Sequence, residues 1–226
     1  EAIHELSTDL EYRQQIRLLG LLYKGKPADT TEIKEWAASP SYYRKRTLLR
    51  ILPIAVTVIN FLCISLAILG IISANIAGGV FVSFVLFSTI FSKGITKLQT
   101  TYGEKLQILS TYADQILLTE QKEMHSHILQ ELKTDLTSQN QTASQAVRQL
   151  SKLMNALDQR SNLLMSTILN GLIFWELRQV MRIEKWKEIH ASDLPRWIET
   201  IGEIDAYCSL ATFAYNHPDY IYPTIA

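Results

Sequence analysis

Residues that could bind a metal ion or act as nucleophiles are few in this chain. His125 and His127 are separated by one residue, which places their side chains about 200° apart around a helix and prevents them from easily sharing one metal ion. We interpret both as exposed histidines on a helix. Cys63 and Cys208 lie far apart in the sequence, and we interpret them as buried thiols in a reducing compartment. The sequence therefore predicts neither a metal site nor a disulfide framework.

The sequence also lacks the short motifs of nucleotide binding and hydrolysis. It contains no phosphate loop of the form Gly-x4-Gly-Lys-Ser/Thr, no Gly-x-Gly-x-x-Gly, no His-Glu-x-x-His and no Gly-x-Ser-x-Gly. Each of these motifs places backbone amides, a metal ion or a nucleophile where its reaction needs them. We therefore expect no catalytic residue, no cofactor and no hydrolytic activity in this chain alone.

A pair of arginines is the remaining candidate for a specific contact. Arg178 and Arg182 lie one helical turn apart, between Trp175 and Trp186. This spacing permits cation–π contacts along the surface of a helix. We expect these arginines to hold helices together rather than to bind a ligand.

The elements that carry these residues are made of two kinds of sequence. The 226 residues include 22 basic and 22 acidic side chains, so the formal net charge is zero, and 47% of the residues are apolar. No charged residue occurs from Ile51 to Ser92. This composition excludes a basic nucleic-acid-binding domain, a disordered acidic tail and a small disulfide scaffold. Without a basic stripe, we expect no salt-sensitive DNA affinity.

The uncharged segment at 51–92 predicts a helical hairpin that crosses a membrane twice. A helix needs about 20 apolar residues to cross the hydrocarbon core, and this segment has room for two such spans, Ile51–Ile72 and Ile76–Ser92. The small residues, Asn and paired glycines of Ser73–Gly79 favour a turn between the spans. Pro53 falls in the first turn of the first span, where its missing N–H costs least.

The flanks of the hairpin predict its orientation. Basic residues stay on the cytoplasmic side of a membrane, so both ends of the hairpin should face the cytoplasm from the cytoplasmic membrane. The alternative is a cytoplasmic protein in which the pair is buried within the chain or a dimer, because the second span is short and polar residues interrupt both spans. The basic residues are Arg44, Lys45, Arg46, Arg50, Lys93 and Lys97, and the polar ones are Asn60, Ser65, Ser83 and Ser88.

Helical periodicity predicts the elements on both sides of the hairpin. Before it, we expect one amphipathic helix from Ile3 to Leu22, a break at Gly25 and Pro27, and a short helix at Ile33–Ala38. After it, we expect a long helix that continues past Ile128 and Leu132. Its apolar face comprises Leu98, Tyr102, Leu106, Leu109, Ala113, Ile116 and Leu117.

A polar turn at Thr134–Ser144 should return the chain into further helices. One has a stripe of Ala146, Leu150, Leu153, Met154 and Leu157, and a denser one runs from Leu163 to Trp186. A last helix begins at Asp193 and Pro195, ends at His217-Pro218, and has Trp197, Ile198, Ile201, Ile204, Leu210 and Phe213 facing inward.

These elements together predict an all-α protein of long antiparallel helices with an apolar hairpin. We divide it into an N-terminal helical part at 1–50, the hairpin at 51–92, a long-helix core at 93–216 and a connector at 217–226.

Several motifs near the end of the chain occur in a recognisable order. Leu169–Arg178 reads Leu-Asn-Gly-Leu-Ile-Phe-Trp-Glu-Leu-Arg, and Glu184-Lys185-Trp186 comes after it. Next come Trp197–Ala206, which reads Trp-Ile-Glu-Thr-Ile-Gly-Glu-Ile-Asp-Ala, then Leu210-Ala211, Ala214–Tyr220 and Pro223. This order resembles the helical core just upstream of the ATPase domain in MutS-related DNA mismatch repair proteins. Glu1–Leu6 and Leu10–Gln14 also resemble the opening of that core.

The resemblance implies a lever-like helical core that couples DNA-contacting parts to an ABC-type ATPase, usually in a homodimer. The ATPase domain, with its ATP and Mg²⁺, would begin beyond Ala226 and would be a partner of this chain. By its position two residues after Pro223, Ile225 would contact the adenine ring in the full-length parent.

Two features depart from the soluble members of that family. Thr134–Ser144 is too short for their DNA-gripping clamp, so mismatched DNA binding is implied for the parent only by the resemblance. The hairpin at 51–92 matches a membrane-associated MutS-like branch. The leading hypothesis is therefore a non-catalytic helical core of a membrane-anchored MutS-like ATPase, and the rival is a membrane-anchored helical sensor or scaffold that binds a protein partner.

Overall fold

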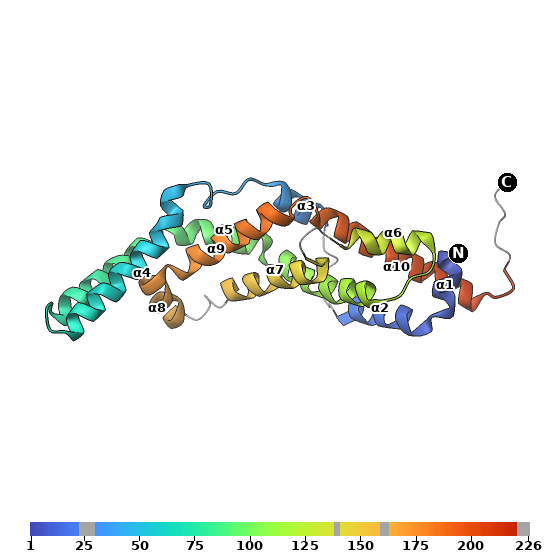
Figure 1. The fold of residues 1–226 in the computed structure, drawn as a ribbon, viewed down its shortest axis with the longest axis horizontal. Helices are drawn as coiled ribbons and strands as arrows, with labels where there is room; N and C mark the ends of the chain where they lie inside the picture. Colours follow the sequence, from blue (N-terminus) through green and yellow to red (C-terminus); the bar gives the residue numbers. More distant parts are fainter. Residues whose placement is uncertain (23–29, 138–140, 159–162, 221–226) are drawn as a thin grey trace. The chain divides into compact units, whose positions relative to one another are not determined.

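The computed structural model describes residues 1–22, 30–137, 141–158 and 163–220. Within these residues, regular secondary structure is α-helical apart from an isolated bridge between Thr137 and Thr142, which confirms the all-α prediction (Figure 1). The helices are α1 (Ala2–Thr8), α2 (Leu10–Leu22), α3 (Thr30–Ala38), α4 (Thr47–Ile68), α5 (Ala74–Gln121), α6 (His127–Asp135), α7 (Ala143–Asp158), α8 (Leu163–Ile173), α9 (Trp175–His190) and α10 (Leu194–Asn216).

The chain folds into two compact units, each assembled from separate segments. The first, here called the α10 unit, contains Glu1–Lys34, Ile108–Gln149 and Ser192–Ala226. The second, here called the hairpin unit, contains Glu35–Gln107 and Leu150–Ala191. Helices α3, α5 and α7 therefore contribute residues to both units.

In the hairpin unit, the uncharged segment forms an antiparallel pair of helices, α4 and the first part of α5 (Figure 1). The turn between them lies at 69–73, earlier than the predicted turn at Ser73–Gly79. Gly70 explains this position, because its φ of 73° is a left-handed conformation that favours glycine. It directly follows Leu69, the C-cap residue of α4. Gly78 and Gly79 lie inside α5, which continues without a break past Ser92.

The helix after the hairpin ends sooner than the sequence predicts. α5 ends at Gln121 and α6 begins at His127, so the expected extension past Ile128 is wrong. His125 consequently lies in the connection rather than on a helix, and both histidines are exposed. Of the predicted α5 stripe, Ala113 and Ile116 are buried, and the side chains at 98–109 lie outside the described residues.

The other predicted turns and stripes are largely confirmed. α3 ends before Pro40, as expected, whereas the predicted break at Gly25 and Pro27 lies outside the described residues. The turn at Thr134–Ser144 separates α6 from α7. The predicted α7 stripe is buried, comprising Ala146, Leu150, Leu153, Met154 and Leu157.

The dense helix predicted from Leu163 to Trp186 is wrong, because Phe174 divides it into α8 and α9. Phe174 has a φ of 52° and a ψ of 52°, a left-handed conformation that costs roughly 1–2 kcal/mol for a non-glycine residue. Its ring is 1% exposed and packs against three phenylalanines of α5, which offsets that cost. The centroids of Phe84, Phe87 and Phe91 lie 6.3, 6.1 and 6.2 Å from that of Phe174.

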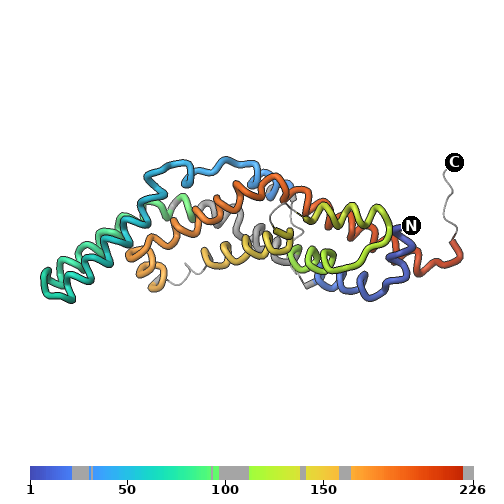
Figure 2. The backbone as a smooth tube through the Cα atoms, viewed as in Figure 1, coloured from blue at the N-terminus to red at the C-terminus, as the bar shows by residue number. Residues whose placement is uncertain are grey.

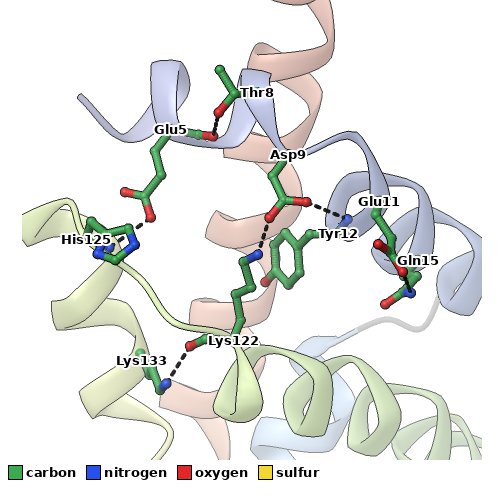
Figure 3. A network of polar contacts seen from close by, with 9 residues as sticks. All are labelled: Glu5, Thr8, Asp9, Glu11, Tyr12, Gln15, Lys122, His125 and Lys133. Atoms are coloured by element: carbon green, nitrogen blue, oxygen red, sulfur yellow. Dashed lines mark hydrogen bonds and ion pairs between the residues drawn. The ribbon is translucent and has the colours of Figure 1, made fainter.

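The single N-terminal helix expected from Ile3 to Leu22 is also wrong, because Asp9 separates α1 from α2. The Asp9 carboxylate accepts a hydrogen bond from the backbone N–H of Tyr12 at 3.0 Å and pairs with Lys122 (Figure 3). An Asp in this position satisfies a free N–H at the start of a helix. Leu10, the first residue of α2 after this break, is 43% exposed.

A second carboxylate joins α1 to the start of α6 (Figure 3). The two oxygens of Glu5 accept hydrogen bonds from the backbone N–H groups of His125 and Ser126 at 2.8 and 2.7 Å. Partial burial alone would raise the pKa of the Glu5 carboxyl, but these hydrogen bonds outweigh burial and hold the pKa below its usual value. Glu5 thus supplies acceptors for free N–H groups of a helix start that has no side-chain cap of its own.

α10 forms the centre of the α10 unit, with α1 and α6 packed against it (Figure 2). It begins after Asp193 with Pro195 in its first turn and ends at Asn216, as predicted. Trp197, Ile198, Ile201 and Ile204 are buried, as expected, but Leu210 and Phe213 are 51% and 53% exposed, so the inward stripe ends earlier than predicted.

We predict that Asp9→Ala lowers the free energy of unfolding by about 1–2 kcal/mol, because α2 loses its capping acceptor and Lys122 loses its partner. Urea unfolding in mild detergent, followed by circular dichroism, measures the change. Glu11→Ala is the matched control, because Glu11 accepts an exposed hydrogen bond from Gln15 of its own helix, and it should change stability far less.

The effect of Asp9 should also depend on pH. Burial alone would raise the pKa of the Asp9 carboxyl. The interactions with Lys122 and the Tyr12 N–H lower this pKa by more than burial raises it, so the folded-state pKa lies below the usual 3.8. The stabilisation is therefore fully present above pH 3.8 and is lost as pH falls through the folded-state pKa. A difference between wild type and Asp9→Ala that stays constant down to pH 2 would contradict this assignment.

Candidate membrane-anchoring surface

The helices of the hairpin present an apolar surface that the described structure leaves uncovered. In Thr47–Ile68 and Ala74–Ser92, only 17% and 6% of the most apolar stretch is buried. By length and composition both helices could cross a membrane, a test that core helices of soluble proteins also pass. Large exposed apolar side chains include Ile51, Ile54, Val58, Phe61, Leu62, Ile64 and Ile68 on α4, and Ile76, Val82, Leu86, Phe87 and Ile90 on α5.

The polarity of the hairpin is inverted relative to a water-soluble helix pair. Asn60 is 2% exposed, whereas its neighbours Phe61 and Leu62 are 61% and 56% exposed. On α5, Ser88 is 9% exposed, and Leu86 and Ile90 are each 65% exposed. In water, exposure of the large apolar side chains is unfavourable. The same arrangement is favourable when lipid surrounds the helices.

The hydroxyl groups of the hairpin do not interrupt its helices. Three of its serines donate a hydrogen bond to a backbone carbonyl of their own helix, which satisfies the hydroxyl without breaking the helix. The acceptors of Ser65, Ser83 and Ser88 are the carbonyls of Phe61, Gly79 and Val85, at 2.8, 2.8 and 2.7 Å.

Asn60 joins α4 to the end of α8. Its side-chain amide donates to the backbone carbonyl of Val56 at 3.0 Å, to that of Gly171 at 2.9 Å and to that of Leu172 at 3.2 Å. Gly171 also allows the end of α8 to lie close to α5, because a Cβ atom there would lie 2.4 Å from the Phe81 ring and 2.5 Å from a Val85 methyl group. Asn60 is therefore an internal contact between helices rather than a polar defect in a span.

Arg178 makes the next contact along the same side of α4. Its guanidinium donates to the Pro53 carbonyl at 2.9 Å, to the Thr57 hydroxyl at 2.6 Å and to the Ile173 carbonyl at 2.8 Å. Arg182 is hydrogen bonded differently, to Gln179 of its own helix. The expectation that Arg178 holds helices together is thus confirmed, through hydrogen bonds to α4 and to the end of α8.

The chain is held at the start of α4 by one buried carboxylate. Glu184 is 5% exposed and accepts hydrogen bonds from the backbone N–H groups of Tyr42, Tyr43 and Arg44 at 2.7, 3.1 and 2.6 Å. The Arg44 side chain also pairs with Glu188 at 2.5 Å. α9 therefore fixes the direction in which the chain enters the hairpin.

Basic and aromatic residues gather beside this entry point. Lys45, Arg46 and Arg50 are exposed, and the Arg46 guanidinium lies 4.8 Å from the centre of the Tyr42 ring. Tyr42 is 56% exposed. Exposed tyrosine and arginine at the end of an apolar helix are typical of the boundary between lipid and cytoplasm.

The other residues considered for chemistry form no site in the described residues. No group of three or more His, Cys, Asp or Glu side chains there could hold a metal ion. Cys208 is buried, as predicted, and burial raises the pKa of its thiol to about 12, so it is protonated at neutral pH. Cys63 is only half-buried, contrary to expectation. Ile225, the predicted adenine contact, lies outside the described residues.

No known protein family, curated protein or solved structure matches the chain. The resemblance to the MutS core therefore rests on the sequence motifs alone.

Sequence reasoning missed the residues that join α8 and α9 to the hairpin. In the sequence, Glu184 stands out only as part of a motif, and Asn60 only as an interruption of a span. A signal was present for Asn60, because a single amide in an uncharged apolar segment must find partners inside the protein. For Glu184, no local pattern marks the distant backbone amides it binds.

We predict that Glu184→Gln speeds amide hydrogen exchange at residues 42–44. The amide side chain has one acceptor oxygen in place of two, so at least one buried N–H loses its partner, at a cost of about 1–3 kcal/mol. Mass spectrometry of deuterated peptides in detergent measures the exchange. Glu188→Gln, which removes a more exposed carboxylate, is the control and should leave amide exchange at Tyr42 and Tyr43 unchanged. Equal exchange rates at residues 42–44 in the two variants would refute the role of Glu184 as the acceptor of these N–H groups.

Proposed function

We propose that this chain is a membrane-anchored, non-catalytic helical module, held in the cytoplasmic membrane by its apolar hairpin with both hairpin ends facing the cytoplasm. The inverted polarity of α4 and α5 carries this proposal, because their exposed side chains include many large apolar ones, such as Phe61 and Leu86, and their buried ones include Asn60 and Ser88. The exposed basic residues Lys45, Arg46 and Arg50 at the entry to α4 support the orientation.

A cytoplasmic location is the alternative, and it requires another protein to cover the hairpin. The exposed apolar side chains extend from Leu48, at the start of α4, through Leu69 and Ile71 in the turn to Ile90 on α5. A protein cover would have to surround both helices along this length. Lipid covers such a surface without any specific partner, which is why we favour a membrane.

We further propose that the module belongs to a MutS-like ATPase and couples the ATPase domain to the membrane-held part. The ordered motifs from Leu169 to Pro223 support this assignment. In this proposal, the chain after α10 leads into the ATPase domain, which would bind ATP and Mg²⁺, with Ile225 against the adenine ring. The parent would act as a homodimer, and its family relationship alone links it to mismatched DNA.

A second candidate function is a membrane-anchored sensor or scaffold that binds a protein partner through the α10 unit. The observation that favours it is a groove of about 720 Å³ between α1 and the end of α10. Its lining includes the exposed apolar side chains of Leu210, Phe213, Tyr215 and Tyr220. An apolar groove with exposed aromatic residues is a common form of protein-binding surface.

We predict that the full-length parent stays in the membrane pellet after extraction at alkaline pH. Replacing Leu62 and Ile64 of α4 by Asp should release it, because each charge near the middle of a span costs about 2.5–3.5 kcal/mol. Replacing Leu210 and Phe213 of α10 by Asp is the matched control, since these residues are also exposed and apolar but lie outside the hairpin. Wild-type protein that is released as cleanly as a soluble marker would rule out the anchor.

The two candidate functions differ in the sequence expected after Ala226 in the parent protein. The MutS-like assignment predicts a phosphate loop shortly downstream and Mg²⁺-dependent ATP hydrolysis by the full-length parent, with no hydrolysis by residues 1–226 alone. ATPase assays of both proteins in lipid vesicles test this. A parent without a phosphate loop or ATPase activity would favour the scaffold.

A further inference from the structure

We infer that α8 and the first turn of α9 form a re-entrant element that dips into the cytoplasmic leaflet beside the hairpin, with the outer face of α8 in contact with lipid acyl chains. This inference rests on the proposed membrane anchor and adds a third lipid-exposed element to it. The evidence begins with α8, a short apolar helix that Phe174 separates from α9.

α8 has the same inverted polarity as the hairpin. Its sequence, Leu163–Ile173, contains no charged residue. Leu164, Met165 and Ile168 are 79%, 52% and 48% exposed, whereas Asn170 is 6% exposed. A helix on the surface of a soluble protein would place these residues the other way round.

The polar groups of α8 point inward, to Glu176. Ser166 donates a hydrogen bond to one carboxylate oxygen of Glu176 at 3.0 Å, and Ser92 of α5 donates to the other at 3.2 Å. The Asn170 side chain accepts from the backbone N–H of Glu176 at 2.9 Å and donates to Ser166 at 3.3 Å. Glu176 is 5% exposed, so the acidic group nearest the turn faces other helices, as an ionisable group at membrane depth must.

The backbone carbonyl groups at the end of α8 have hydrogen-bond donors within the protein, as a lipid environment requires. The last carbonyl groups of a helix have no partner within the helix, and lipid offers none. Here the carbonyls of Gly171 and Leu172 accept from the Asn60 amide, and that of Ile173 accepts from Arg178. Three consecutive carbonyls thus lie within hydrogen-bond distance of donors on α4 and α9, with the two hydrogens of the Asn60 amide shared between these carbonyls and that of Val56, so the turn at Phe174 can lie away from water.

The length and packing of α8 fit a helix that enters one leaflet and turns back. Its 11 residues extend about 16 Å at 1.5 Å per residue, roughly half of a hydrocarbon core of about 30 Å. Its end contacts Asn60, near the middle of α4, and the side chains of Phe81 and Val85 on α5. From there α9 returns along α4, past Pro53, to Glu184 beside the start of the hairpin.

Fluorescence quenching in lipid vesicles tests this inference on the full chain. In a Cys63→Ala/Cys208→Ala background, a single cysteine labelled with the fluorophore NBD replaces Ile168 on α8, Ile64 on α4 or Ile189 near the end of α9, all of which are exposed. Lipids with brominated acyl chains should quench the probes at 168 and 64 but not the probe at 189. Iodide in the water should quench only the probe at 189. Circular dichroism checks that each labelled protein keeps its helix content.

The outcomes separate this inference from the proposed anchor. A probe at 168 that iodide quenches, while brominated lipid still quenches the probe at 64, overturns the re-entrant element and leaves the hairpin anchor standing. A probe at 168 that neither agent reaches overturns lipid as the occupant and indicates a second copy or another protein on α8. If brominated lipid quenches none of the three probes, the anchor itself is wrong.

Discussion

The structure of the hairpin unit depends on one constraint, which is that every buried polar group must find its partner inside the protein. Asn60 meets it most clearly, because its amide donates to its own helix and to two carbonyls at the end of α8. The Arg178 guanidinium likewise donates hydrogen bonds to the carbonyls of Ile173 and Pro53 and to the hydroxyl of Thr57. With these groups satisfied, large apolar side chains such as Phe61 on α4, Leu86 on α5 and Leu164 on α8 can occupy the exposed surface, and this combination is what a lipid solvent requires.

The α10 unit shows the opposite pattern, that of a water-facing protein. Its core includes Leu6, Ile16, Trp197 and Ile201, and the carboxylates of Asp9 and Glu5 join separate segments of the unit. Asp9 and Glu5 each bind backbone N–H groups at the start of a helix and so determine where α2 and α6 begin. The chain therefore combines one unit whose exposed helices are rich in large apolar side chains with another in which carboxylates bind the helix starts, as expected of the membrane-anchored module that we propose.

Much of this organisation was predictable from composition and periodicity. An uncharged stretch of this length with turn-forming residues near its middle predicts a helical pair, and helical spacing predicts the stripes of α7 and of the first half of α10. Breaks that depend on tertiary contacts were not predictable. Asp9 interrupts a regular pattern because Lys122 and the Tyr12 N–H bind it, and Phe174 takes a left-handed conformation because three phenylalanines of α5 surround its ring. The ordered motifs that resemble the MutS core include residues that are buried in this structure, such as Glu184 and Trp197, and none of these motifs lies within the apolar hairpin.

The central claim is that lipid surrounds the apolar hairpin, and spin labels along α4 test it most directly. Labels placed one at a time at the exposed positions Ile51, Ile54, Val58, Phe61 and Ile68 in vesicle-bound protein report their accessibility to oxygen and to a water-soluble nickel chelate. We expect oxygen accessibility to be greatest near Val58 and Phe61 and to fall towards both ends of the helix, with nickel accessibility varying in the opposite way. Labels that the nickel chelate reaches equally at every position, or that neither reagent reaches, would contradict the account.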